Sequence, residues 1–159
     1  MARASLKQAR KTEAAERLIL ERFLPYRLSI LSNRVSRAIA KRYAKTFALT
    51  IPEWRIIAVL GQRPGLTATE IAEATEMDKV AVSRAVAKLA AARRVAAHVD
   101  AADGRRQLLS LTMHGENLHA RIAPIALESE RRLLAALSAG ERAQLDALLE
   151  RLLGAARSL

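Results

Sequence analysis

The sequence predicts a mainly α-helical fold that carries one small β-hairpin. Apolar residues recur at spacings of three and four through most of the chain, which is the period of a helix buried on one face. Around residues 95–111 they alternate instead, and Asp103-Gly104 within that stretch is typical of a hairpin turn. Capping motifs separate the helical segments, so the elements can be taken in chain order.

Length and charge limit the possible functions. The chain has 159 residues, about the size of one domain, and its 27 Lys and Arg exceed its 16 Asp and Glu to give a formal charge of +11. This excess favours a polyanionic partner, and the many arginines favour nucleic acid over a membrane. The chain contains no cysteine and no apolar run near the roughly 20 residues of a membrane span. We therefore expect a cytoplasmic protein that has no disulfide and does not bind a membrane.

A long helix is predicted in the first half of the chain. Residues 1–24 are expected to form an N-terminal arm, followed by a helix over residues 25–47 in which Pro25 suits the first turn. Such a helix would be roughly 33 Å long at 1.5 Å per residue, which is more than a small domain covers. We expect it to pack in a bundle with a partner. Its apolar face consists of Leu28, Leu31, Val35 and Ile39.

A second face of the same helix is basic. At spacings of three and four it carries Arg34, Arg37, Lys41 and Lys45. A solvated surface is the more common role of such a face. The alternative is an anion-binding wall, in which Asn33 and Ser36 join Arg34 and Arg37 around a carboxylate or a phosphate.

A shorter helix is predicted next. Thr50 is its expected cap, and Pro52 and Glu53 suit its first turn. Trp54, the only tryptophan, shares the spacing of the apolar residues around it. A core role is therefore favoured for Trp54, with a role in binding the anionic ligand as the alternative. The run from Gly61 to Gly65 ends the helix.

Two further capped helices follow. Thr67 and Glu70 form a capping box, and Asp78 is the expected cap of a helix that extends to about Ala92. The outward-facing side chains of this second helix are short or basic, which lets its backbone approach base edges and its cations reach guanine or phosphate. They are Lys79, Val80, Ala81, Ser83, Arg84, Ala87 and Lys88.

A basic hairpin completes this segment. Strands are predicted over residues 95–99 and 107–111, and Arg105 and Arg106 come just past the turn between them. Arginine is attracted to the negative potential of a narrow minor groove. Two capped helices followed by a hairpin with arginines at its tip are the order of a winged helix-turn-helix, in which the hairpin is the wing.

The chain is predicted to end in two more helices. Thr112 is the expected cap of a helix that extends to about Leu137 with a kink at Pro124, and Ser138 opens the last helix with a capping box.

These helices carry more leucine than one winged unit can bury. We therefore assign residues 48–111 to a DNA-binding unit, and residues 25–47 and 112–159 to a helical dimerisation region of a homodimer.

Over residues 24–153 the chain resembles the MarR family of bacterial transcription regulators. The resemblance implies a triangular dimer whose two winged units bind a palindromic operator. It also implies that Ser83 and Arg84 contact the major groove, and that Arg105, oriented by Asp103, enters the minor groove. Four runs in the family's order and spacing carry it: Pro52-Glu53-Trp54-Arg55, Met77 to Arg84, Asp100 to Arg106, and Leu111-Thr112 followed by Gly115.

The chain departs from the family pattern at the end of the second capped helix. Arg93 stands where the family usually has glycine, so either the left-handed turn is strained or the chain leaves the helix another way. Arg93 and Arg94 are alternatively phosphate contacts. Residues 27–37 look similar to a branch that responds to aromatic acids or their coenzyme A thioesters.

These observations lead to one preferred hypothesis and one alternative. The preferred hypothesis is a dimeric, sequence-specific transcriptional repressor, released from DNA by a small anionic ligand such as an aromatic acid or an acyl-coenzyme A bound near Arg34 and Arg37. The alternative is an architectural DNA-binding protein without an effector. A repressor prefers its operator to random DNA by roughly a thousandfold or more, whereas an architectural protein discriminates much less.

An enzyme is not expected. His98, His114 and His119 have no catalytic partner at a recognisable spacing, and no cofactor is indicated. A metal site through His114, Glu116 and His119 is disfavoured, because histidines five residues apart do not share one helical face.

Overall fold

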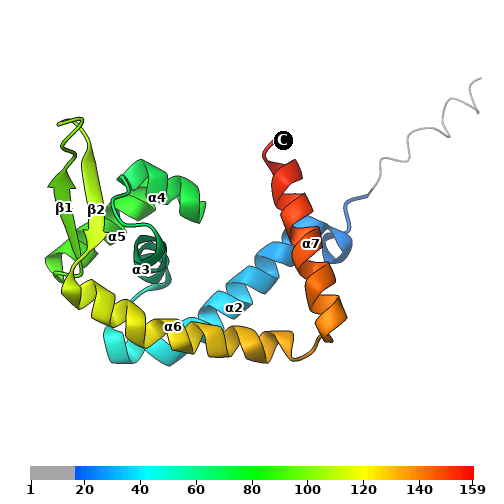
Figure 1. The fold of residues 1–159 in the computed structure, drawn as a ribbon. Helices are drawn as coiled ribbons and strands as arrows, with labels where there is room; N and C mark the ends of the chain where they lie inside the picture. Colours follow the sequence, from blue (N-terminus) through cyan, green and yellow to red (C-terminus); the bar gives the residue numbers. More distant parts are fainter. Residues whose placement is uncertain (1–16) are drawn as a thin grey trace, which may run out of the picture. The chain divides into compact units, whose positions relative to one another are not determined.

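The computed structural model describes residues 17–159, which divide into two compact units (Figure 1). The first unit ends at Ser36, and the second is Arg37–Leu159. The predictions for residues 1–16 lie outside the described residues. The long helix α2, Leu24–Phe47, continues through the boundary, which falls inside a helix that we had assigned as a whole to the dimerisation region.

The first unit is short and helical. A 3-10 turn, η1, covers Leu20–Arg22 at the end of the predicted arm, and α2 begins two residues later. The apolar side chains of this unit are largely exposed: Leu24, Leu28 and Leu31 keep 45%, 41% and 50% of their surface accessible. The apolar face predicted for the first half of α2 therefore has no cover within its own unit.

The second unit has the predicted order of helices and hairpin. Its elements after the end of α2 are α3 (Ile51–Gln62), α4 (Ala68–Thr75), α5 (Lys79–Ala91), β1 (Val95–Val99), β2 (Gln107–Leu111), α6 (Met113–Leu134) and α7 (Ala139–Ala156). This mainly helical fold with one two-stranded antiparallel hairpin confirms the predicted fold class. None of the helices in the described part of the chain is long and apolar enough to cross a membrane.

Side-chain caps fix the starts of the helices. Thr50, Thr67 and Ser138 each form a capping box, which satisfies backbone N–H groups that have no partner inside the helix. Asp78 and Thr112 cap α5 and α6 through their side-chain oxygens. The structure thus confirms all five predicted caps.

One core joins the end of α2 to the winged unit. The largest fully buried side chains come from α2 to α6, so residues 37–47 and the start of α6 pack with the helix-turn-helix. Arg42 strengthens this packing, because its Nη1 donates to the Ser129 hydroxyl at 2.7 Å. The buried apolar residues are Tyr43, Leu49, Ile56, Ile57, Leu60, Ile71, Ala72, Val82, Ala85, Leu89, Val95, Leu109, Leu118 and Ile122.

The hairpin has the predicted strands, and the predicted turn lies within the loop that joins them. Val95 pairs with Leu111 and Val99 with Gln107, which leaves residues 100–106 as the loop. The Asp100 N–H donates to the Arg106 carbonyl at 3.0 Å, and Gly104 does not have a positive φ. Within that loop the Arg106 N–H donates to the Asp103 carbonyl at 2.9 Å, so Asp103-Gly104 begins a tight turn as predicted, and this turn needs no left-handed glycine.

The two C-terminal helices differ in burial. α6 ends at Leu134, slightly earlier than predicted, and continues through Pro124. α7 has no buried residue, and its leucines remain partly accessible, for example Leu148 at 45% and Leu149 at 37%. Its apolar side chains therefore have no complete cover within the described chain.

Candidate nucleic-acid interface

The outer face of α5 carries most of the predicted major-groove residues. Val80, Arg84 and Lys88 follow one another at intervals of four and are exposed, as are Lys79 and Ser83. Val80 keeps 59% of its surface accessible, so a short apolar side chain faces solvent beside three cations. Ala81 is half-buried, because it lies at the edge of the face toward the core. This surface combines an apolar contact for thymine methyl groups with guanidinium and ammonium donors.

A hollow lies beside this face, where α5 meets the start of α3. It is lined from α5 by Ala81, Arg84, Ala85 and Lys88, and from α3 and its cap by Thr50, Pro52 and Glu53. At the start of α3, Pro52 has no N–H and the Glu53 N–H donates to the Thr50 hydroxyl. Arg84 and Lys88 are therefore the groups of this hollow that favour phosphate.

The chain leaves α5 through a strained residue. Arg93 has φ +54°, so the left-handed turn is made without glycine, which is the first of the two predicted exits. Arg94 points inward: its Nη2 donates to the Phe47 carbonyl at 2.7 Å and its Nη1 to the Ala48 carbonyl at 3.4 Å. Arg94 thus ties the exit of α5 to the end of α2, and the alternative that it contacts phosphate is wrong.

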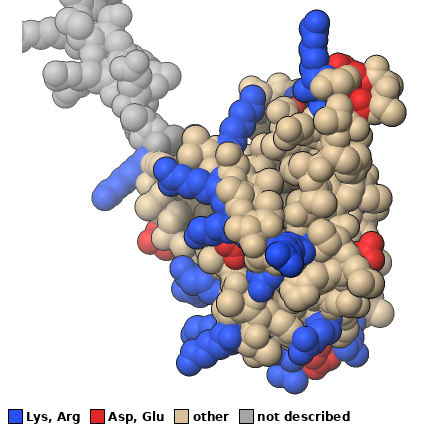
Figure 2. Space-filling model, turned by 90° about the vertical axis from the view of Figure 1, so that its left-hand side faces the viewer, with Lys and Arg blue, Asp and Glu red and all other residues tan. Residues whose placement is uncertain are grey.

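The tip of the wing presents Arg105 to solvent. The Asp103 carboxylate accepts the Arg105 backbone N–H at 3.0 Å, so Asp103 fixes the backbone from which the Arg105 side chain extends. No ion pair or side-chain hydrogen bond involves the Arg105 guanidinium among residues 17–159. Lys and Arg side chains are also spread over much of the face that Figure 2 shows, with fewer Asp and Glu among them.

Arg106 is placed differently from Arg105. Its Nη2 lies 3.1 Å from Glu70 Oε1 on α4, and its Nη1 lies 3.7 Å from Asp100 Oδ2 in its own loop. The sequence identified Glu70 only as a helix cap. The signal that could have linked it to the wing is charge: a capping carboxylate uses one oxygen for the helix and leaves the other for a cation.

Hydrogen bonds to Glu70 make the start of α4 sensitive to acid. Donation from the Thr67 N–H and hydroxyl, with Arg106 nearby, holds the pKa of the Glu70 carboxyl below its usual value of 4.5. A carboxylate with a lowered folded pKa stabilises the protein above its unfolded pKa, and this stabilisation is lost as the pH falls through the folded value. We expect the urea concentration at the unfolding midpoint to decrease as the pH falls below about 4.5. The decrease should be smaller in Glu70→Gln, whose amide oxygen still caps the helix.

Urea unfolding between pH 7 and 3 measures this effect. Glu130→Gln, which removes an exposed carboxylate from α6, is the matched control. Equal pH dependence in Glu70→Gln and the wild type would contradict the expectation.

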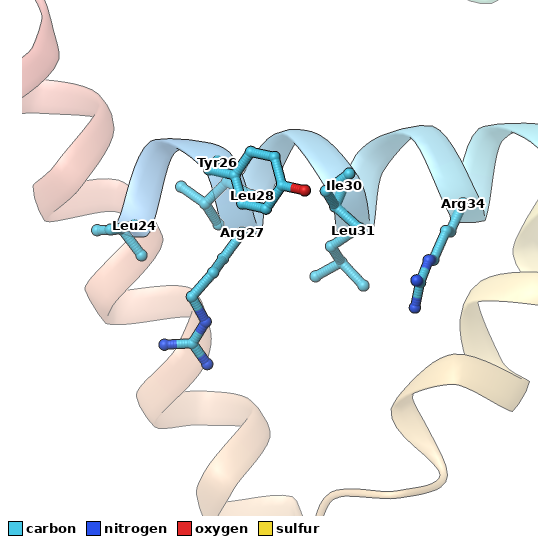
Figure 3. Close-up of a pocket in the computed structure, with 7 residues that line it drawn as sticks. All are labelled: Leu24, Tyr26, Arg27, Leu28, Ile30, Leu31 and Arg34. Atoms are coloured by element: carbon cyan, nitrogen blue, oxygen red, sulfur yellow. The ribbon is translucent and has the colours of Figure 1, made fainter. Parts of the chain in front are cut away.

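The predicted ligand residues are only partly brought together. In the first unit, one face of α2 forms a hollow of about 550 Å³. In Figure 3 the guanidinium groups of Arg27 and Arg34 extend from the same side of the helix, with Leu31 between them. The lining residues are Leu24, Tyr26, Arg27, Leu28, Ile30, Leu31 and Arg34.

Asn33, Ser36 and Arg37 do not line this hollow, although Asn33 donates to the Ser29 hydroxyl at 3.5 Å. Arg27 lines the hollow, although it is not among the predicted ligand residues. The sequence feature that could have identified it is its position seven residues before Arg34, which puts both side chains on one helical face.

Trp54 belongs to an aromatic cluster of the second unit. Its ring lies 5.9 Å from that of Tyr43 and is stacked on His119 at a centroid distance of 5.9 Å. This is the core role favoured from the sequence. Among residues 17–159, no group of three His, Asp or Glu side chains is arranged to hold a metal ion.

Comparisons with known proteins decide the family. A model of the MarR family matches residues 49–106. The HTH-type transcriptional repressor Rv2887 of Mycobacterium tuberculosis is 30% identical over 131 residues, which cover 82% of this chain and 91% of the relative. The chain belongs to the MarR family. This protein is therefore a DNA-binding transcriptional regulator with a winged helix-turn-helix.

Two solved structures have the same fold. MepR of S. aureus, in a complex with DNA, is 27% identical with a TM-score of 0.73 and covers 84% of this chain and 98% of its own. PcaV of Streptomyces coelicolor, in a complex with its natural ligand, is 25% identical with a TM-score of 0.68 and covers 88% of this chain and 98% of its own.

Proposed function

We propose that this protein is a homodimeric repressor that binds a palindromic operator and is released by a small anionic ligand. The observation that carries the proposal is the outer face of α5, which presents Arg84 and Lys88 beside the exposed Val80. The face reads the major groove, with Ser83 and Arg84 at base edges and Lys79 and Lys88 at phosphates. Arg105 of the wing enters the adjacent minor groove.

Dimerisation is supported by apolar surface that the single chain leaves uncovered. Both the first half of α2 and the whole of α7 expose leucine, and obligate interfaces resemble a divided core. A two-fold dimer places two recognition helices about 34 to 36 Å apart, one turn of DNA, and so matches a palindrome.

We expect Leu148→Asp to convert the dimer into a monomer and to abolish tight operator binding, because a carboxylate cannot be buried unpaired in an apolar interface. Sedimentation velocity measures the change. The exposed Asp146→Asn on the same helix is the control, and a dimeric Leu148→Asp protein would contradict the role of α7.

The effector proposal is supported by the hollow on α2. Two guanidinium groups that extend from one side of the helix, with Leu31 between them, suit a ligand that has one carboxylate and an apolar body. Aromatic acids and their coenzyme A thioesters are the class we propose. The solved complex of PcaV with its natural ligand is consistent with a ligand-responsive regulator.

We expect Arg34→Ala to bind operator normally and to be released by its inducer only at about tenfold higher concentration or more, because one charge-assisted hydrogen bond to the carboxylate is lost. Titration of the protein–DNA complex with the inducer measures this shift. Arg37→Ala is the matched control, since Arg37 does not line the hollow. A normal response in Arg34→Ala would contradict this placement.

One experiment tests the whole proposal. Gel shifts on the DNA upstream of the protein's own gene, repeated with a panel of aromatic acids and their coenzyme A thioesters, should give a shifted band that one compound class removes. Equal affinity for that DNA and for scrambled DNA would instead support an architectural protein, which the charge of +11 also suits.

A further inference from the structure

One carboxylate joins the wing to α4. Glu70 Oε2 accepts the Thr67 N–H at 2.7 Å and the Thr67 hydroxyl at 2.8 Å, which completes the cap of the helix. The other oxygen, Oε1, accepts Arg106 Nη2 at 3.1 Å. Because the cap already fixes the orientation of this carboxylate, Arg106 meets an acceptor that is held in place rather than a freely rotating side chain.

Arg106 also closes the wing loop. Its carbonyl accepts the Asp100 N–H at 3.0 Å, its own N–H donates to the Asp103 carbonyl at 2.9 Å, and its Nη1 lies 3.7 Å from Asp100 Oδ2. The backbone of the loop and the guanidinium that reaches α4 thus belong to one residue. Arg106 therefore links the loop that carries Arg105 to α4.

Among residues 17–159, the wing tip has no other such tie. The base of the hairpin is held where Leu66 and Leu109 form a β-bridge, but residues 96–99 and 101–106 are exposed. Within the described chain, the contact between Arg106 and Glu70 is the only side-chain hydrogen bond or ion pair that joins the loop of residues 100–106 to a helix. An exposed hairpin tip without such a tie would have to be ordered when DNA binds, at a cost in affinity.

We propose that Arg106 and Glu70 form a latch that holds the wing against α4, so that Arg106 positions Arg105 for the minor groove and does not itself read DNA. This proposal rests on the proposed role of the wing and replaces the expectation that Arg106 is a direct DNA contact. Arg105 is the reading residue, and Arg106 is a positioning residue one place further along the chain.

A double-mutant cycle separates the two roles of Arg106. The probe is the palindromic DNA that the wild-type protein selects from a random-sequence pool. We expect Arg106→Ala and Glu70→Gln each to raise Kd by about two- to fivefold, the range of an exposed ion pair, and the double variant to be no weaker than either single one. Glu70→Gln keeps a capping acceptor, so α4 should remain folded.

The sign of the Glu70→Gln effect is decisive. Removal of a carboxylate near DNA should tighten binding if only charge matters, whereas loss of the latch should weaken it. If Arg106→Ala weakens binding and reduces the salt dependence by about one phosphate contact while Glu70→Gln does not weaken it, Arg106 is a direct contact and the latch is overturned.

A second measurement needs no DNA. The chain has no cysteine, so spin labels can be attached at Ala74→Cys on α4 and Ala102→Cys in the wing loop, both exposed positions. We expect a narrow distance distribution that broadens in Glu70→Gln and in Arg106→Ala but not in the matched control Arg105→Ala. An unchanged distribution in both latch variants overturns the proposal. If the proposed minor-groove role of Arg105 is wrong, Arg105→Ala will bind DNA normally. That outcome can be told apart from a failure of the latch, which the distance distributions report.

Discussion

Gly115→Ala is expected to lower the free energy of unfolding by about 3 kcal/mol, the upper end of the cost of overpacking. A Cβ atom on Gly115 would lie 2.1 Å from the Arg94 carbonyl oxygen and 3.3 Å from Leu111 Cβ. The first of these neighbours is backbone, so it cannot rotate away as the end of a side chain can. Either α6 or the exit of α5 has to move.

The cost is large because the Arg94 carbonyl already accepts a hydrogen bond. The Arg94 carbonyl accepts the Thr112 N–H at 3.1 Å, and the Thr112 hydroxyl donates to the Arg93 carbonyl at 2.7 Å while it caps α6. Displacing α6 would weaken these bonds together and disturb the left-handed turn at Arg93. The turn lies just past α5, the helix proposed to read the major groove, so operator binding should fall with stability.

Thermal unfolding checks this expectation. For a chain of this size the midpoint should fall by about 6–12 °C. Gly154→Ala on α7 is the matched control, because a Cβ there meets no atom of residues 17–159 within 4 Å. That change should be neutral or stabilise the protein by up to about 1 kcal/mol through helix propensity. A Gly115→Ala protein as stable as the wild type would show that α6 packs less closely on the Arg94 carbonyl than the structure indicates.

Local features of this fold could be predicted from the sequence, and distant ones could not. The caps at Thr50, Thr67 and Ser138 involve residues three apart, so the pattern that predicts them contains both partners. The pairing of Arg106 with Glu70 spans 36 residues. Nothing in the spacing of either residue indicates the other.

The same distinction applies to the candidate site. The outer face of α5 followed from helical periodicity alone, because exposure there is set by which side packs on the core. Arg93 and Arg94 looked equivalent as neighbouring cations, but Arg94 donates to carbonyls 46 and 47 residues away at the end of α2. The Asp103-Gly104 turn could be predicted for the opposite reason: the Arg106 N–H and the Asp103 carbonyl that close it are only three residues apart.

Arg84→Ala should weaken operator binding by about 1–3 kcal/mol, or roughly 5- to 150-fold in Kd, and should relax base preference in the major groove. Arg84 is exposed on the outer face of α5, four residues after Val80. Its planar guanidinium can donate two parallel hydrogen bonds to a guanine edge, which an alanine cannot replace. The loss should therefore be much larger on the operator than on scrambled DNA.

Lys88→Ala provides the matched comparison, because Lys88 lines the same hollow one helical turn further along α5. An ammonium group that meets phosphate carries no sequence information, so its removal should weaken operator and scrambled DNA alike and reduce the salt slope by about one. Fluorescence anisotropy on both DNAs, at several salt concentrations, distinguishes the two variants. Arg151→Ala on α7 controls for the loss of one positive charge outside the winged unit. If Arg84→Ala weakens both DNAs equally, Arg84 binds phosphate, and the base reading falls to Ser83, Val80 and the wing.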